Sequence, residues 1–91
     1  MAEKNCVLIL IKIETEKICD VIKKFISLKD KIKEMFVVTG IFDLVLLLEN
    51  HSQQEIIDII KRDIQNIEGI KKINILMTLK RYRHLLKPGK R

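Results

Sequence analysis

Aromatic side chains are scarce in this chain of 91 residues, which has no tryptophan, one tyrosine and three phenylalanines. A surface that stacks nucleic-acid bases on aromatic rings is therefore not expected. No apolar run approaches the roughly 20 residues that a membrane-spanning helix needs, and no signal peptide is evident. No linker or low-complexity tract divides the chain. The sequence predicts a soluble, cytoplasmic protein with one small domain.

Groups suited to catalysis or metal binding are also few. Cys6 and Cys19 have no metal-ligand spacing to His51 or His84, and without a signal peptide both cysteines are expected to be reduced. The sequence has no Ser-His-Asp or Cys-His arrangement and no glycine-rich phosphate loop. We therefore expect no catalytic residues, no metal and no cofactor. His51 is expected at a helix boundary and His84 in solvent.

The positive charge is concentrated at one end of the chain. The net charge is +6, yet residues 1–79 carry 12 basic and 12 acidic side chains. We therefore divide the chain into a domain at 1–80 and a basic tail at 81–91. Such a tail can bind nucleic acid electrostatically, and this is the alternative function. The basic residues of this end are Lys80, Arg81, Arg83, Lys87, Lys90 and Arg91.

The hydrophobic pattern predicts six elements of regular structure. Alternation indicates strands, and apolar residues three or four apart indicate helices. Thr15 is the expected cap of the first helix. Ser52 and Glu55 form a capping box for the second helix, and Gly69 provides its left-handed exit. The expected order is strand 6–13, a helix from 15, strand 32–38, strand 43–49, a helix from 52 and strand 70–79.

This order repeats a β-α-β unit twice, which predicts an α+β, ferredoxin-like fold. The sheet would have four antiparallel strands in the order 4-1-3-2, with both helices on one face. Strands 6–13 and 43–49 are the most apolar, so we place them at the centre. Strands 32–38 and 70–79 carry charged residues, which are typical of edges. In the second helix Asp63 lies on the apolar side, either at a subunit contact or at the solvent edge.

Both faces of the two central strands are apolar, although helices can cover only one face. Burying one leucine side chain is worth roughly 1.5–3 kcal/mol, and an open patch of several leucines is unusual for a monomer. We therefore expect an obligate dimer that packs sheet against sheet. The residues expected at this interface are Leu8, Leu10, Leu44, Leu46 and Leu48.

The segment 38–44, Val-Thr-Gly-Ile-Phe-Asp-Leu, is expected to form a turn between the second and third strands. Gly40 permits a close approach of a ligand to the backbone. Exposed turn amides can hold a carboxylate, and Asp43 can accept from an ammonium group, so the turn suits an α-amino acid. In the other interpretation Gly40 only fits the geometry of a hairpin turn and Asp43 caps backbone groups.

With this turn and the double β-α-β pattern, the chain resembles the ligand-binding domain of the Lrp/AsnC family of leucine-responsive and asparagine regulators. The likeness covers about 6–79 and is most specific at 38–44 and 67–71. It implies sheet-to-sheet dimers that assemble into rings, often octamers, with an amino-acid effector bound between dimers. Matched by motif, the effector-binding positions are Thr39, Gly40, Phe42 and Asp43.

Two departures from the family pattern refine this expectation. Family members usually carry a helix-turn-helix domain in front, whereas five residues precede the first strand here. The chain therefore resembles a stand-alone member that senses an effector alone or joins full-length Lrp/AsnC regulators. Many relatives that bind effectors have hydroxyl-bearing residues at the positions of Ile73 and Ile75. The isoleucines favour an apolar effector, or packing without a ligand.

Two other ferredoxin-like classes fit less well. A dimeric α/β-barrel enzyme needs acid–base groups that the sequence does not provide. ACT domains, which bind amino acids, typically have a glycine in the loop after the first strand, and residues 14–17 have none.

Overall fold

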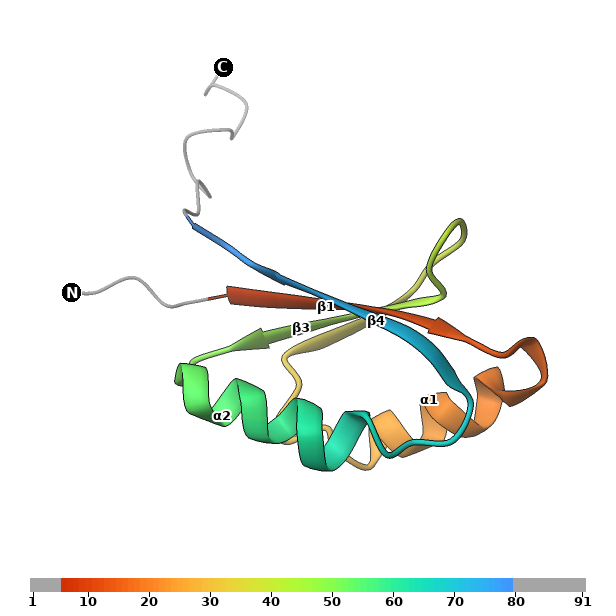
Figure 1. Ribbon diagram of the computed structural model, residues 1–91, viewed down its shortest axis with the longest axis horizontal. Helices are drawn as coiled ribbons and strands as arrows, with labels where there is room; N and C mark the ends of the chain where they lie inside the picture. The colour runs from red at the N-terminus through yellow and green to blue at the C-terminus, as the bar shows by residue number, and fades with distance from the viewer. Residues whose placement is uncertain (1–5, 80–91) are drawn as a thin grey trace, which may run out of the picture.

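The computed structural model describes residues 6–79, in which one face of an antiparallel sheet is covered by helices (Figure 1). The strand order β2-β3-β1-β4 confirms the predicted order and fold class. The elements are β1 (Cys6–Ile13), the 3-10 helix η1 (Thr15–Lys17), α1 (Ile18–Ile26), β2 (Glu34–Val37), β3 (Leu44–Glu49), α2 (Gln53–Asp58), the π-helical segment η2 (Ile59–Ile64) and β4 (Ile70–Met77).

The core lies between the sheet and the helix layer. Alternate residues of β1 and β3 point to the helices, because successive side chains of a strand face opposite sides. They pack against Val21 and Phe25 of α1 and against isoleucines of α2 and η2. The helix-facing residues of the two central strands are Val7, Ile9, Ile11, Ile13, Leu44, Leu46 and Leu48.

This arrangement corrects the prediction that Leu44, Leu46 and Leu48 belong to a dimer interface. All three are fully buried in the core of one chain. Leu46 lies opposite Ile9 in the β1–β3 register, so both side chains point to the helices. The prediction was wrong by one residue, because Val45 and Leu47 are the β3 side chains that share the other face with Leu8 and Leu10.

The start of the second helix confirms the sequence analysis, whereas its end differs: η2 stops at Ile64 with Gln65 as its cap, so Gly69 lies in the turn before β4 and is not the exit of the helix. The Ser52 hydroxyl accepts a hydrogen bond from the Glu55 backbone N–H at 3.1 Å, and the Glu55 carboxylate accepts from the Ser52 N–H at 2.7 Å. The helix continues through η2, where the Gln65 N–H donates to the Ile60 carbonyl at 2.8 Å. Gly69 then takes a φ of +103°.

The first helix begins differently from the prediction. Thr15 is the first residue of η1, and neither η1 nor α1 has a side-chain cap. The Lys17 N–H donates to the Glu14 carbonyl at 2.8 Å, so a tight turn replaces the expected threonine cap.

The Lys17 ammonium lies 3.3 Å from the Glu68 carboxylate, and this hydrogen bond and the Glu68 charge raise the pKa of Lys17.

Candidate functional site at the loop between β2 and β3

The loop at residues 39–42 rises from the end of the sheet on the side away from the helices (Figure 1). Gly40 has a φ of +113°, and a Cβ atom at this position would meet nothing within 4 Å. Thr39 is exposed, Ile41 is 79% exposed and Phe42 is half-buried. The loop therefore presents backbone groups and an apolar side chain to solvent in the single chain.

Asp43 fixes the base of this loop to β1. Its Oδ2 atom accepts a hydrogen bond from the Ile13 N–H at 2.9 Å and lies 3.5 Å from the Lys12 ammonium. The Asp43 N–H donates to the Ile11 carbonyl at 2.9 Å, and the Val38 N–H donates to the Asp43 carbonyl at 3.0 Å. Asp43 thus caps backbone groups, as the second interpretation of the turn predicts. Within residues 6–79 its other carboxylate oxygen makes no hydrogen bond.

The helices leave one sheet face uncovered, which we call the open face. Strand alternation and register place apolar side chains from all four strands on it. Phe36 and Leu76 are 46% and 51% exposed, and the side chains between them are half-buried. The apolar members include Leu8, Leu10, Phe36, Val45, Leu47 and Leu76, with the polar Asn74 opposite Leu10, and the charged members Lys12, Glu34, Asp43, Glu49 and Lys72 lie around them.

A model of the Lrp/AsnC ligand-binding domain matches residues 6–85 of the sequence. The chain belongs to the Lrp/AsnC family. The match covers most of the chain and includes the loop, Asp43 and the open face. No curated protein matches the sequence significantly.

Solved structures share the fold of this Lrp/AsnC domain at low sequence identity. TTHA0845 from Thermus thermophilus has a TM-score of 0.79 and 23% identity, over 87% of this chain and 98% of that chain. AsnC from E. coli has a TM-score of 0.77 and 20% identity, over 85% of this chain and 52% of AsnC. The regulator NMB0573 from Neisseria meningitidis, solved as an L-Met complex, has a TM-score of 0.72 and 17% identity, over 88% of this chain and 53% of that protein. The chain thus spans about half the length of these two regulators.

Ile73 and Ile75 lie on the other side of the sheet from the loop of this Lrp/AsnC domain. They are opposite Ile11 and Ile9 in the β1–β4 register, so they share the helix-facing side of the sheet. Ile73 is half-buried beside the core, whereas Ile75 is 42% exposed. The structure therefore does not bring these isoleucines together with Asp43 on the open face.

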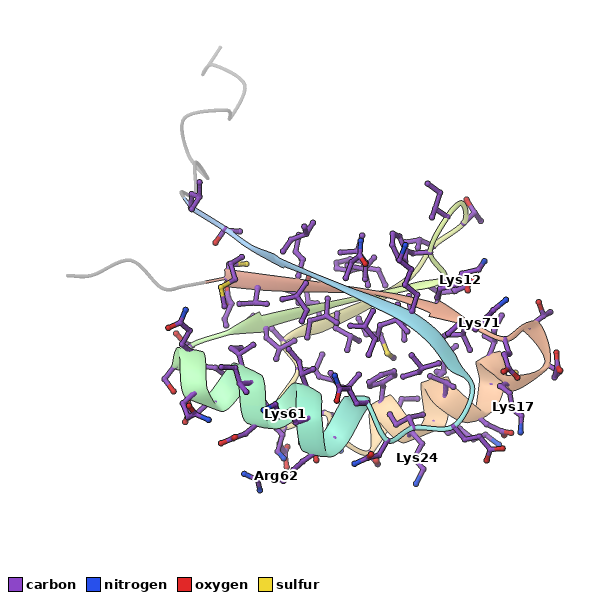
Figure 2. The ribbon with its side chains drawn as sticks, in the orientation of Figure 1. Lys12, Lys17, Lys24, Lys61, Arg62 and Lys71 are labelled. Atoms are coloured by element: carbon purple, nitrogen blue, oxygen red, sulfur yellow. The ribbon has the colours of Figure 1, made fainter. Side chains whose placement is uncertain are left out.

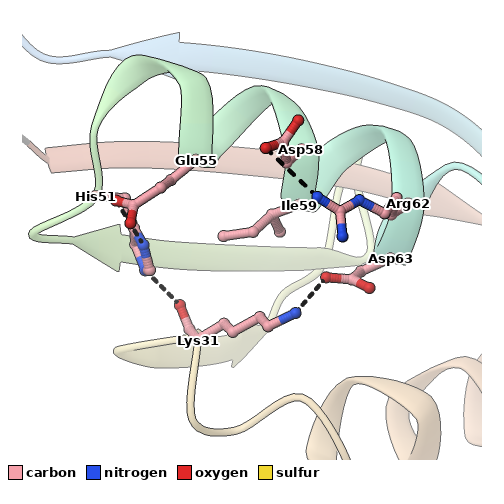
Figure 3. A pocket seen from close by; sticks show the side chains of 7 residues that line it. All are labelled: Lys31, His51, Glu55, Asp58, Ile59, Arg62 and Asp63. Carbon is pink, nitrogen blue, oxygen red and sulfur yellow. Dashed lines mark hydrogen bonds and ion pairs between the residues drawn. The ribbon is translucent and has the colours of Figure 1, made fainter.

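A second candidate site is a polar hollow of about 210 Å³ on the helix layer (Figure 3). The Lys31 ammonium and Asp63 carboxylate are 2.8 Å apart, so the basic partner of Asp63 belongs to the same chain. His51 Nε2 lies 3.1 Å from the Lys31 carbonyl oxygen. The hollow is lined by Lys31, His51, Glu55, Asp58, Ile59, Arg62 and Asp63. Since its charged groups pair mostly with one another, we favour the loop as the candidate functional site.

The sequence analysis did not single out Lys12, Lys31 or Lys72. Lys12 could have been noticed as the charged end of an apolar strand face, whereas nothing near Lys31 in the sequence indicates its contact with Asp63.

In residues 6–79 no helix is long and apolar enough to cross a membrane. The same residues hold no group of three or more His, Cys, Asp or Glu side chains that could bind a metal ion.

Proposed function

We propose that this Lrp/AsnC domain is a non-catalytic sensor that binds an amino acid at the loop and assembles through its open face. The main support is Asp43, which anchors the loop with one carboxylate oxygen and leaves the other oxygen available. Beside it, Gly40 leaves backbone groups accessible in open space. A carboxylate oxygen and free backbone amides match the ammonium and carboxylate groups of an α-amino acid.

The open face supports assembly. Removing one leucine-sized side chain from water contributes roughly 1.5–3 kcal/mol. The partly exposed apolar side chains of Leu8, Leu10, Val45 and Leu47 are joined by Phe36 and Leu76 at the two edges. We infer a sheet-to-sheet homodimer that assembles further into rings such as octamers. Full-length Lrp/AsnC regulators are further proposed partners, through which the domain acts in transcription regulation.

The effector site is completed in the assembly. In one chain the loop has no wall on its outer side, since nothing lies within 4 Å of a Cβ built at Gly40. We therefore place the effector between the loop of one copy and the surface of another. Ile41 and Phe42 offer apolar contacts, which favours an apolar effector. Thr39 adds a hydroxyl group close to Gly40.

A thermal-shift screen of the standard amino acids, paired with light scattering, tests this function. We expect an apolar amino acid to raise the melting temperature and to change the mass of the assembly. The variant Asp43→Asn should lose the thermal shift, whereas Asp63→Asn makes the same charge change on the helix layer and should keep it. If no amino acid alters either quantity in the unmodified protein, effector sensing is refuted.

A second candidate function is nucleic-acid binding, which the excess of six basic residues after residue 79 favours. Lys80, Arg81, Arg83, Lys87, Lys90 and Arg91 lie outside the described residues. Binding through them would weaken steeply with salt, because phosphate contacts release counterions. Titrating duplex DNA and RNA at two salt concentrations, with and without residues 80–91, tests this function. Equal binding by both chains would exclude the tail.

A further inference from the structure

Two lysines face each other on the open face at the end that carries the loop. Lys12 of β1 lies directly opposite Lys72 of β4 in the antiparallel register. Directly opposite residues share a sheet face, with Cβ atoms about 4.5–5.5 Å apart. Figure 2 places Lys12 at the end of the sheet from which the loop rises.

Asp43 continues this row across a third strand. Ile11 of β1 is opposite Leu44 of β3. The next residue of β1 is Lys12, and the residue before Leu44 is Asp43, so these two residues are neighbours across the strands. Their side chains meet at 3.5 Å, which confirms that they are on the same face. Asp43, Lys12 and Lys72 therefore form one charged row below the loop.

The row has an unbalanced positive charge. Asp43 supplies one carboxylate, and this carboxylate also accepts the hydrogen bond from the Ile13 N–H. Lys72 is exposed and forms no ion pair within the described part of the chain. Like charges directly opposite each other destabilise a sheet. An anion bound beside Lys72 would remove this repulsion.

We propose that Lys72, assisted by Lys12, binds the carboxylate of the amino-acid effector. The free oxygen of Asp43 accepts from the effector ammonium, and the effector side chain points toward the apolar part of the loop. The row thus provides one group for each charge of a zwitterion, a carboxylate at the loop and an ammonium on a long, flexible side chain two strands away. This inference rests on the proposed sensing function and assigns to side chains a role that backbone amides of the loop would otherwise fill alone.

Calorimetric titration with L-leucine, L-isoleucine, L-valine and L-methionine, each beside its primary amide, tests the assignment. The amide retains the ammonium group and the side chain but has no carboxylate charge. The test variant is Lys72→Gln. The matched control is Lys71→Gln, because Lys71 is the extra residue at the register shift between the pairs Lys12–Lys72 and Ile13–Ile70.

Losing a hydrogen bond to a charged group corresponds to roughly a 10- to 100-fold weaker affinity. We expect this loss for Lys72→Gln with the acids, and a smaller difference between acid and amide in that variant, because Lys12 remains. Lys71→Gln should bind within about twofold of the unmodified protein, since Lys71 has no residue of β1 directly opposite it. Without ligand, Lys72→Gln should melt about 1–4 °C higher, because like-charge repulsion is relieved.

The outcomes separate this inference from the proposed function. If the unmodified protein binds an acid and Lys72→Gln binds it equally well, the lysine assignment is wrong and sensing stands. If the unmodified protein binds acid and amide with equal affinity, the lysine assignment is again wrong and sensing again stands. If none of the four amino acids binds to the unmodified protein, both the sensing of apolar amino acids and the lysine assignment are refuted.

Discussion

Leu46 and Leu47 are neighbours in β3 that we expect to have opposite roles. Leu46 is 0% exposed and packs in the core beneath the helices. Replacing a buried leucine by alanine costs about 2–5 kcal/mol, which is a large part of the roughly 5–15 kcal/mol that stabilises a typical domain. Leu46→Ala should therefore unfold at much lower temperature or denaturant concentration.

Leu47→Lys should leave the single chain folded and disrupt the dimer. Leu47 is only half-buried in one chain, on the open face. Because each Leu47 is already half-buried in its own chain, losing both leucines of a symmetric dimer removes about 1.5–3 kcal/mol of further apolar burial. This corresponds to a dissociation constant roughly 10- to 100-fold higher, and the desolvation of two ammonium groups adds to the loss.

Light scattering over a range of protein concentrations measures the assembly, and circular dichroism measures the fold. The matched control is Ile26→Lys, because Ile26 is 53% exposed on α1 and lies on the helix layer. We expect Leu47→Lys to be a folded monomer at concentrations where Ile26→Lys remains dimeric. A Leu47→Lys protein with the unmodified dissociation constant would refute the reasoning, and so would an unmodified protein that is monomeric at micromolar concentration.

Three further predictions concern stability, measured by urea unfolding. Asp43→Ala should lose about 1.5–3 kcal/mol, because a backbone N–H of β1 loses its charged acceptor; an unchanged midpoint would contradict this anchoring role. Ser52→Ala should lose about 1 kcal/mol with its helix cap, and Ser52→Thr serves as its control, since the hydroxyl is retained. Gly69→Ala should lose more than Gly40→Ala. Both alanines would have to adopt a positive φ, which costs about 1–2 kcal/mol. Only at Gly69 would the added Cβ atom also lie 2.6 Å from the Lys17 Cβ atom. Equal losses would show that the crowding at Gly69 is relieved.

The sequence predicts the strand order because apolar content differs between central and edge strands. It cannot assign the faces of β3, because both faces of this strand are apolar and the period-two signal disappears. Only the register to β1, in which Leu46 lies opposite Ile9, decides that Leu46 is in the core. In β1 the prediction placed Leu8 and Leu10 on the uncovered face, and the structure has them there, because Val7, Ile9 and Ile11 face the helices.

Local signals succeed where the interacting groups are close in the sequence. Ser52 and Glu55 are three residues apart, so their capping box is readable as a motif. Thr15 shows the limit of such motifs. It has the right side chain for a cap, but the Glu14 N–H bonds to the Gly69 carbonyl at 2.8 Å, and the chain then enters α1 through a 3-10 turn. A contact with residue 69 cannot be inferred from residues near 15.

The candidate site depends both on a local motif and on contacts between residues that are distant in the sequence. Gly40 and Asp43 belong to one short motif, so the sequence indicates the turn, and it leaves open whether Asp43 binds a ligand or caps the backbone. The structure makes these roles compatible, because Oδ2 is engaged by Ile13 and Lys12 while the other oxygen is available. Lys72 joins the row only through a register that spans sixty residues of sequence. The charge partner of an effector carboxylate therefore has to be sought in the fold, since no local motif contains it.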